Sequence, residues 1–230
     1  MAGRALRGQE RGEGARCPLG RGSPPLVRAD RSARTAAGVG GGAGAARSAA
    51  REVRSFGDGL FVDLIPTSCW FTNVRTCVSP ADWARVKALV VGRTGQRCEV
   101  CGIGAEPSHG LWLEAHERWS YDDSTRVQTL RRLVCLYTRC HRTTHFGFAE
   151  VTGQGLQAHA HLRAVNQWGD ADADAHIATA ARVWRARSAV DWSLDLSILT
   201  AAGVVPSPAP TAARRSIATD TIDRIIHDTP

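Results

Sequence analysis

The segment CLYTRCHRTTHFG, residues 135–147, places two cysteines and two histidines within thirteen positions. Thiolate sulfur and imidazole nitrogen are the ligands that zinc prefers in proteins. A second segment, Cys98-Glu-Val-Cys101-Gly102, has the spacing of a zinc knuckle, in which two thiolates of one tight turn bind the same ion and a following glycine relieves the backbone. Together the two segments predict a structural zinc site that joins distant parts of the chain.

A structural zinc ion takes four ligands, and the sequence offers two candidates for the fourth. A second C-x2-C pair would need a cysteine at position 137, but Tyr137 stands there. Cys135 lies two residues earlier and is expected on the same face of a strand, so a shift near the end of the strand would present its sulfur. His145 is the alternative and would give a site of three cysteines and one histidine. Three ligands are common to both arrangements, namely Cys98, Cys101 and Cys140.

The cysteine count favours metal binding over disulfides. The chain has seven cysteines, an odd number, and its N-terminal part lacks an apolar run of the kind found in signal peptides. Disulfides are rare in a reducing compartment. No stretch approaches the apolar length that spans a membrane, so we expect a cytoplasmic protein without membrane contact.

Positive charge is concentrated at the N-terminal end. The chain has 29 Lys and Arg against 22 Asp and Glu, a net charge of +7. Residues 1–55 contain eleven arginines and four acidic residues, a difference of 11 − 4 = +7, so residues 56–230 carry no net charge. The arm at residues 1–58 has too few apolar residues to offset the entropy of folding. We predict that it is disordered, with binding to nucleic acid as the functional alternative.

The first elements beyond the arm are a strand and a helix. A short apolar run predicts a strand at residues 60–65. Ser79 followed by Pro80 is typical of a helix start, with serine as the N-cap and proline at the first helical position. Gly92 or Gly95 is expected to end this helix.

The middle and the end of the chain predict a hairpin and more helices, and therefore an α+β fold. Residues 111–119 and 130–136 are expected to pair as a hairpin, followed by a helix near His141. Residues 156–168 and 170–187 have helical periodicity.

Five segments follow from this pattern. They are a basic arm (1–58), a strand and helix (59–95), a zinc-binding ββα module (96–152), a helical segment packed on that module (153–200) and a tail (201–230).

Three segments in this order resemble the HNH endonuclease superfamily. They are Cys98-x2-Cys101, LEAHERW at residues 113–119 and LVCLYTRCHRTTH at residues 133–145. The similarity is closer to uncharacterised bacterial HNH-like zinc-knuckle proteins with LEAHERW-like and CH-x3-H-like segments. The resemblance implies a small ββα-metal module of the treble-clef or HNH-like type, flanked by α-helices, with a zinc knuckle at the base of the hairpin.

The same resemblance implies a metal-dependent endonuclease that hydrolyses phosphodiester bonds of DNA. In that family a histidine of the first strand activates water, which makes His116 the general base, and a neutral imidazole can accept a proton near pH 7. His141 and His145 are four positions apart, so on a helix both point to one side and can bind a divalent ion such as Mg²⁺, Mn²⁺ or Ni²⁺. No site role is predicted for the other five histidines, His109, His159, His161, His176 and His227.

Arginines around the same segments predict contacts with DNA phosphates. The stretch 124–149 contains five arginines and no acidic residue. Guanidinium groups suit phosphate because they can donate two parallel hydrogen bonds to it. The five residues are Arg126, Arg131, Arg132, Arg139 and Arg142.

Two positions differ from the pattern of the family. The residue before the strand histidine is usually an acid or a histidine that binds the metal, but it is Ala115 here. The asparagine that commonly positions the base aligns near Arg132. The alternative function is therefore a zinc-stabilised HNH-like module that has lost catalysis and binds nucleic acid or a protein partner.

Overall fold

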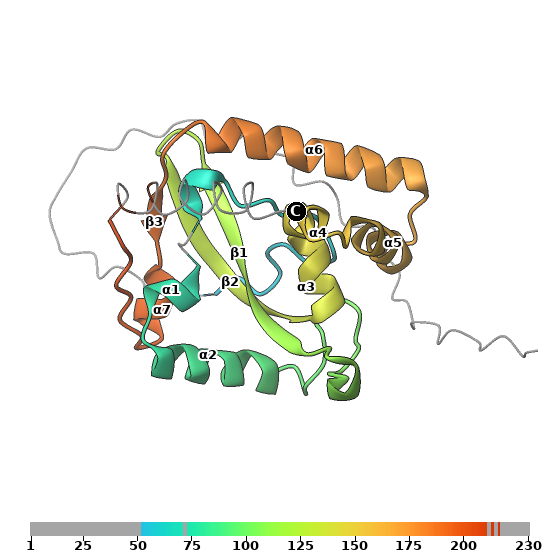
Figure 1. Ribbon diagram of the computed structural model, residues 1–230. Helices are drawn as coiled ribbons and strands as arrows, with labels where there is room; N and C mark the ends of the chain where they lie inside the picture. Colours follow the sequence, from blue (N-terminus) through green and yellow to red (C-terminus); the bar gives the residue numbers. More distant parts are fainter. Residues whose placement is uncertain (1–51, 71–72, 211–212, 214–215, 217–230) are drawn as a thin grey trace, which may run out of the picture.

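The computed structural model describes residues 52–70, 73–210, 213 and 216 of the chain (Figure 1). Most of the predicted arm, residues 1–51, lies outside the described residues, as does most of the predicted tail beyond residue 210. The end of the arm, residues 52–58, contacts the centre of the fold. The backbone N–H of Val53 donates to the carbonyl oxygen of Arg131 at 2.9 Å.

The described chain contains both helices and strands, and the two long strands follow each other directly between groups of helices, which confirms the predicted α+β class. The elements in chain order are η1 (Thr67–Cys69), α1 (Val74–Cys77), α2 (Pro80–Gly92), η2 (Pro107–His109), β1 (Leu113–Asp122), β2 (Val127–Tyr137), α3 (Thr138–Thr144), α4 (Phe146–Val151), α5 (Gly155–Asn166), α6 (Asp170–Ser188), β3 (Ser193–Asp195) and α7 (Ser197–Ala201).

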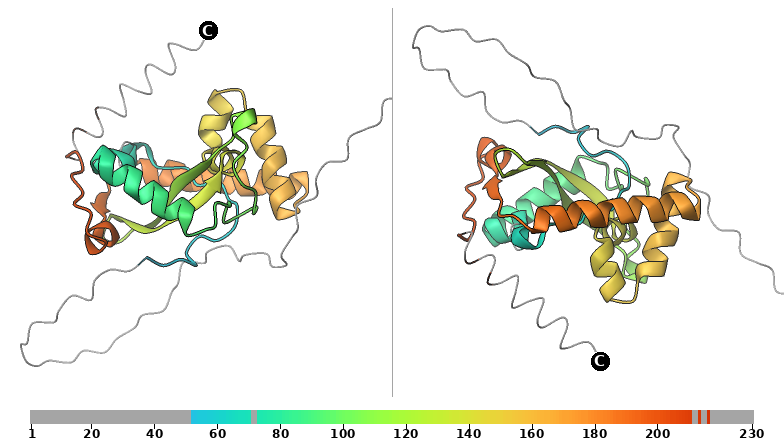
Figure 2. Two further views of the ribbon diagram at one scale, coloured as in Figure 1. Left: turned by 90° about the horizontal axis from the view of Figure 1, so that it is seen from below. Right: turned by 90° about the horizontal axis from the view of Figure 1, so that it is seen from above.

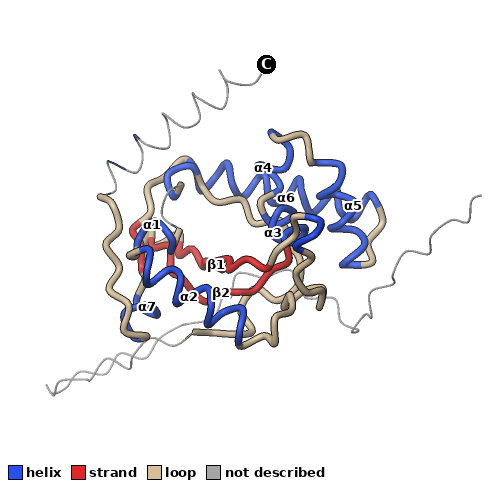
Figure 3. The backbone as a smooth tube through the Cα atoms, turned by 60° about the horizontal axis from the view of Figure 1, so that its bottom comes forward, coloured by secondary structure: helices blue, strands red, loops and turns tan. Residues whose placement is uncertain are grey.

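The long hairpin of β1 and β2 forms the centre of the molecule (Figure 3). β2 is the middle strand of a three-stranded sheet and pairs antiparallel with β1 and parallel with the short β3. The turn is closed by Asp122, whose carboxylate accepts hydrogen bonds from the backbone N–H groups of Ser124 and Thr125. The predicted hairpin is therefore confirmed, with both strands longer than expected.

The two faces of the hairpin pack into two apolar cores, because side chains alternate between the faces of a strand. α2 lies along one side of the hairpin and α6 along the other (Figures 1 and 2). The first core joins β2 to α4, α5 and α6 and includes Val134, Leu136, Phe146, Leu162 and Ala173. The second core joins both strands to α2 and α7 and includes Leu130, Leu133, Cys135, Val86, Val90 and Leu199.

The strand predicted at residues 60–65 is wrong. The segment is extended, but its hydrogen bonds go to helices rather than to a neighbouring strand. The N–H of Val62 donates to Nε2 of His176 in α6 at 3.0 Å, and the N–H of Asp63 donates to the carbonyl oxygen of Thr144 at 2.9 Å. The apolar run indicated burial correctly, but it could not indicate which groups would form hydrogen bonds with the backbone N–H groups.

The start of α2 follows the predicted signals. The hydroxyl oxygen of Ser79 accepts the N–H of Asp82 at 3.0 Å, with Pro80 at the first helical position, and the helix ends at Gly92. α3 begins at once where β2 ends, with Tyr137 as its N-cap residue. Among the described residues, none of the helices has both the length and the apolar character needed to cross a membrane.

Candidate metal centres

Three histidines converge between β1 and α3. His116 belongs to β1, His141 lies within α3, and His145 follows α3 directly. The ring centroid of His116 is 5.2 Å from that of His141 and 4.8 Å from that of His145, and the latter two centroids are 4.7 Å apart. One possible ligand nitrogen of each ring lies within 4.8 Å of those of the other two, so one metal ion could be held among them.

Local structure explains this convergence. The N–H of His145 donates to the carbonyl oxygen of His141 at 3.1 Å, so one helical turn separates the two residues and their rings share a side. His116 pairs with Val134 on β2, three residues before that strand ends. Because no loop separates β2 from α3, the helix folds back beside the strand that carries His116 (Figure 1).

His116 is deeply buried, and its ring has no hydrogen-bond partner in the part of the chain that the structure describes. It is 1% exposed, and both of its ring nitrogens are buried. Burial lowers the pKa of His116 well below its ordinary value, helped by the charges of His145, Arg118 and His141. Burial also lowers the pKa of His145 to about 3. A neutral imidazole with a free lone pair is the form that binds a metal or accepts a proton.

A carboxylate orients one of the three rings. Nδ1 of His141 lies 3.0 Å from Oε2 of Glu114, which stands two positions before His116 and therefore on the same face of β1. Burial raises the pKa of Glu114, but the hydrogen bond and charge of His141 lower it by more, and the net shift is downward. An ionised partner at Nδ1 leaves Nε2 of His141 free for an ion, an arrangement common among metal-binding histidines. Sequence reasoning did not assign this role to Glu114, for which its strand position was the only available signal.

Three cysteines, one of them in α3, form a second cluster. The sulfur atoms of Cys98, Cys101 and Cys140 all lie within 4.8 Å of one another, so this cluster could also hold a metal ion. None of the six described cysteines forms a disulfide. The predicted convergence of the knuckle with Cys140 is therefore observed.

Neither predicted fourth ligand reaches these cysteines. Cys135 pairs with Ala115 and is buried in the second core, on the far face of the hairpin. Tyr137, two residues later, packs in the first core with Cys140, because the strand ends there and its alternation ends with it. His145 belongs to the histidine cluster. The expectation that positions 135 and 137 share a face is thus corrected.

One arginine predicted to bind DNA is a buried part of the fold. Arg132 is 2% exposed. Its guanidinium pairs with the carboxylates of Asp58 at 2.6 Å and Glu99 at 2.7 Å. Both partners compete with any phosphate, so the structure does not leave Arg132 available as a DNA contact.

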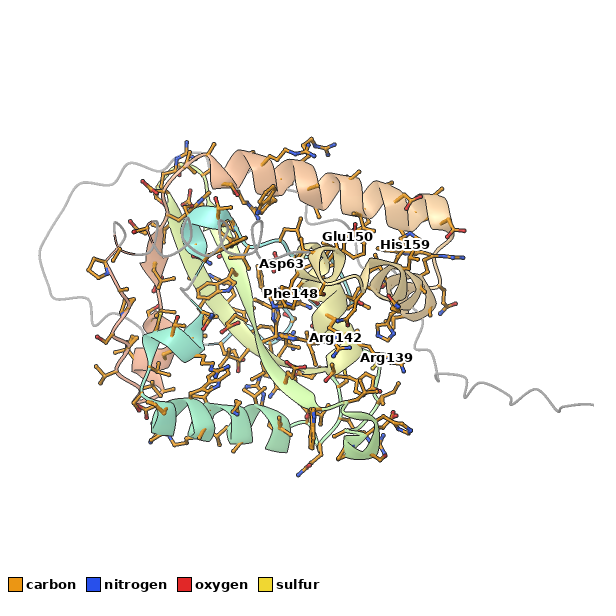
Figure 4. All side chains as sticks on the ribbon, in the orientation of Figure 1. Asp63, Arg139, Arg142, Phe148, Glu150 and His159 are labelled. Atoms are coloured by element: carbon orange, nitrogen blue, oxygen red, sulfur yellow. The ribbon has the colours of Figure 1, made fainter. Side chains whose placement is uncertain are left out.

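The other four arginines differ in position. Arg139 and Arg142 are exposed and project from α3, the helix that carries His141 (Figure 4). Arg126 is exposed in the hairpin turn, about 25 Å along the strand from the histidines. Arg131 is half-buried and lies over the ring of Phe56. The exposed positive charge nearest to His141 in the sequence is that of Arg142 and Arg139.

The two clusters suit different chemistry. Closed sets of thiolates are typical of structural zinc, whereas a set of three protein ligands leaves coordination positions open for water or substrate.

Comparison with known proteins adds nothing to this description: no protein-family model, curated protein or solved structure matches the chain.

Proposed function

We propose that the protein is a metal-dependent endonuclease of the HNH type, which hydrolyses phosphodiester bonds of DNA. The observation that carries the proposal is the position of His116, buried against His141 and His145 with both ring nitrogens unpartnered among the described residues. A hairpin followed directly by a helix, with three thiols at their junction, supports the ββα-metal interpretation of this module.

The residues divide into two roles in this proposal. His141 and His145 hold a divalent ion, and Glu114 fixes the orientation of His141. Such an ion would polarise the scissile phosphate and stabilise the leaving oxygen. His116 accepts the proton of the attacking water, since its lowered pKa keeps it neutral at pH 7. Imidazole ligands favour Ni²⁺ over Mg²⁺, so Ni²⁺ is expected to support activity better.

Plasmid nicking tests the proposal. Wild-type protein is expected to nick supercoiled DNA with Ni²⁺, Mn²⁺ or Mg²⁺. His116→Ala should lower the rate at least about a hundredfold, the usual contribution of a general base. His141→Ala should do the same by losing the ion. His109→Ala is the matched control and should nick as wild type does, because its side chain is 71% exposed and pairs with Glu106, away from the histidine cluster.

Metal binding separates the two roles. Titration with Ni²⁺ should show that His116→Ala still binds the ion and that His141→Ala does not. Equal nicking by wild type and His116→Ala, or no nicking by either, contradicts the proposal.

A second candidate function, a module that binds nucleic acid or a protein without cleaving it, is favoured by one observation. Ala115 supplies no ligand and faces the opposite core. Glu117 cannot replace it, because its carboxylate is buried and accepts the N–H of Val74 at 2.8 Å. With only three imidazoles available, His116 would become a third ligand, and no base would remain among them. In that case His116→Ala weakens ion binding as His141→Ala does, and wild-type protein binds DNA without nicking it.

A further inference from the structure

The loop 98–102 is shaped to present sulfur to a metal ion. The backbone N–H groups of Val100 and Cys101 both point at Sγ of Cys98, at 3.4 and 3.5 Å. Gly102 has φ +73°, a left-handed conformation that glycine adopts without strain, and its N–H donates to the carbonyl oxygen of Cys98 at 3.0 Å. The loop is therefore a compact turn whose amides stabilise negative charge on a thiolate.

The three thiols of the cluster are too close to be independent side chains. The sulfur atoms of Cys98, Cys101 and Cys140 all lie within 4.8 Å of one another. Thiolates gathered in this way are stabilised when a cation stands among them, and a closed tetrahedral site requires one more ligand.

Position 137, where a second cysteine pair would place its first thiolate, is occupied in another way. Tyr137 is buried beside Cys98 and Cys140, and its hydroxyl group lies 3.2 Å from the carboxylate of Glu106. Its side chain therefore supplies no ligand. The backbone of Cys135 does hold the knuckle, since it exchanges two hydrogen bonds with Glu99, but its sulfur lies in the other core.

A histidine of α5, His161, contacts the cysteine cluster, whereas the side chains of Tyr137 and Cys135 do not supply a ligand. Nε2 of His161 lies 3.1 Å from Sγ of Cys140. Zinc held by sulfur at about 2.3 Å and by nitrogen at about 2.0 Å in tetrahedral geometry places those two ligand atoms about 3.6 Å apart. The Cys140–His161 distance needs only a small outward movement to meet this value, and the ring must also move towards the loop 98–102, because the ligand atoms that lie within 4.8 Å of one another are those of the three cysteines.

Packing between helices fixes His161 in this position. Ala158 and Leu162 form the buried face of α5, and His161 shares that face because it lies three positions after Ala158. The hydroxyl group of Thr143 in α3 donates to the carbonyl oxygen of Ala158 at 3.3 Å. α5 is thereby held beside α3, with His161 turned towards Cys140.

We propose that Cys98, Cys101, Cys140 and His161 form a structural zinc site. The ion joins the loop 98–102 to the start of α3 and to the middle of α5. It thus connects the hairpin module to the helices that follow it. This site is separate from the histidine cluster and does not depend on the protein being a nuclease.

The first test measures metal retention in the full-length chain. Co²⁺ bound by thiolates gives a sulfur-to-cobalt charge-transfer band, which ions in the histidine cluster do not give. His161→Ala should weaken Co²⁺ and Zn²⁺ binding at this site at least about tenfold, measured by competition with a chelator. His159→Ala is the matched control: it lies on the same helix but contacts Asp174 at 3.0 Å, so retention should equal that of wild type.

The second test reads the ligands directly. Zinc X-ray absorption is measured in a His141→Ala background, so that zinc bound by the thiols dominates the signal. Three sulfurs and one nitrogen are expected, and His161→Cys should restore retention with four sulfurs. Wild-type affinity in His161→Ala, equal losses in His159→Ala, or a sulfur count that stays at three in His161→Cys would overturn the proposal.

Discussion

Arginines of one short segment lie in very different surroundings. Arg132 is enclosed by the carboxylates of Asp58 and Glu99, whereas Arg139 and Arg142 extend into solvent from α3. A buried ion pair contributes to a fold mainly through the cost of breaking it, while an exposed arginine costs little to remove. Their residue type alone does not distinguish a structural charge from a ligand-binding one.

Arg132→Ala is expected to destabilise the protein by about 3 kcal/mol, since it removes a buried guanidinium and leaves the half-buried carboxylate of Glu99 without its closest cation. Urea unfolding measures this effect. Arg139→Ala should change stability by less than about 0.5 kcal/mol, as substitutions of exposed side chains usually do.

DNA binding should respond in the opposite order, with the larger loss of affinity in Arg139→Ala and the smaller one in Arg132→Ala. Arg139→Ala should weaken binding to DNA of any sequence and reduce the slope of log K against log salt by about one.

In the urea experiment, equal stability of Arg132→Ala and Arg139→Ala would show that the Arg132 ion pairs contribute nothing to the fold.

At the scale of elements, the segment 60–67 is held by helix side chains instead of by strand pairing. Besides the contact of Val62 with His176, the indole N–H of Trp184 donates to the carbonyl oxygen of Ile65 at 3.1 Å, and the N–H of Thr67 donates to Ser188 at 3.1 Å. Side chains of α6 therefore form hydrogen bonds with the backbone of this extended segment. Helix side chains at regular spacing can satisfy a backbone as a neighbouring strand does.

The bond between Val62 and His176 makes stability depend on pH. His176 accepts a hydrogen bond through Nε2 and must be neutral to do so, and burial lowers its pKa in the folded chain. A lowered pKa means that the unfolded chain binds the proton more readily, so this contribution is complete above about pH 6.5 and is lost as the pH falls below that value.

His176→Gln is the variant that tests this pH dependence, because glutamine keeps an acceptor but does not titrate. Urea unfolding of both proteins between pH 8 and pH 5 should show a smaller loss of stability in the variant. His176→Ala should cost about 1 kcal/mol at pH 8, since it leaves the N–H of Val62 without its acceptor. Parallel pH profiles of wild type and His176→Gln would contradict this assignment.

At the scale of the whole molecule, the two candidate metal-binding clusters share one short helix. α3 carries Cys140 in its first turn and is followed directly by His145, which joins the histidine cluster. A zinc ion among the cysteines would fix the same helix that positions His141. The structural site would therefore support the geometry of the proposed catalytic site without taking part in its chemistry.

Removing zinc is expected to lower the melting temperature of the full chain by about 10 °C or more, because a structural ion contributes several kcal/mol to folding and each kcal/mol shifts Tm by about 3 °C at this size. Calorimetry with and without a zinc chelator measures the shift. His141→Ala should show the same shift, since its cysteine cluster is intact. An unchanged Tm after metal analysis has confirmed zinc loss would contradict a structural role.

Local patterns in the sequence were enough to predict the α+β class, the hairpin, the start of α2 at Ser79 and the meeting of Cys98 and Cys101 with Cys140. They were also enough to place His141 and His145 on one side of a helix. Each of these features depends on residues that are close in sequence, on strand alternation, or on a ligand type that is rarely used otherwise.

Tertiary structure decided the rest. The sequence offered Cys135 as one candidate for the fourth ligand, because it could not show that the alternation of β2 ends at Tyr137. It excluded His161, whose approach to Cys140 depends on the packing of α5 against α3 across 21 positions. The physical reason is that local propensities act over a few residues, whereas a ligand set is completed by whichever side chain the packed helices bring within bonding distance.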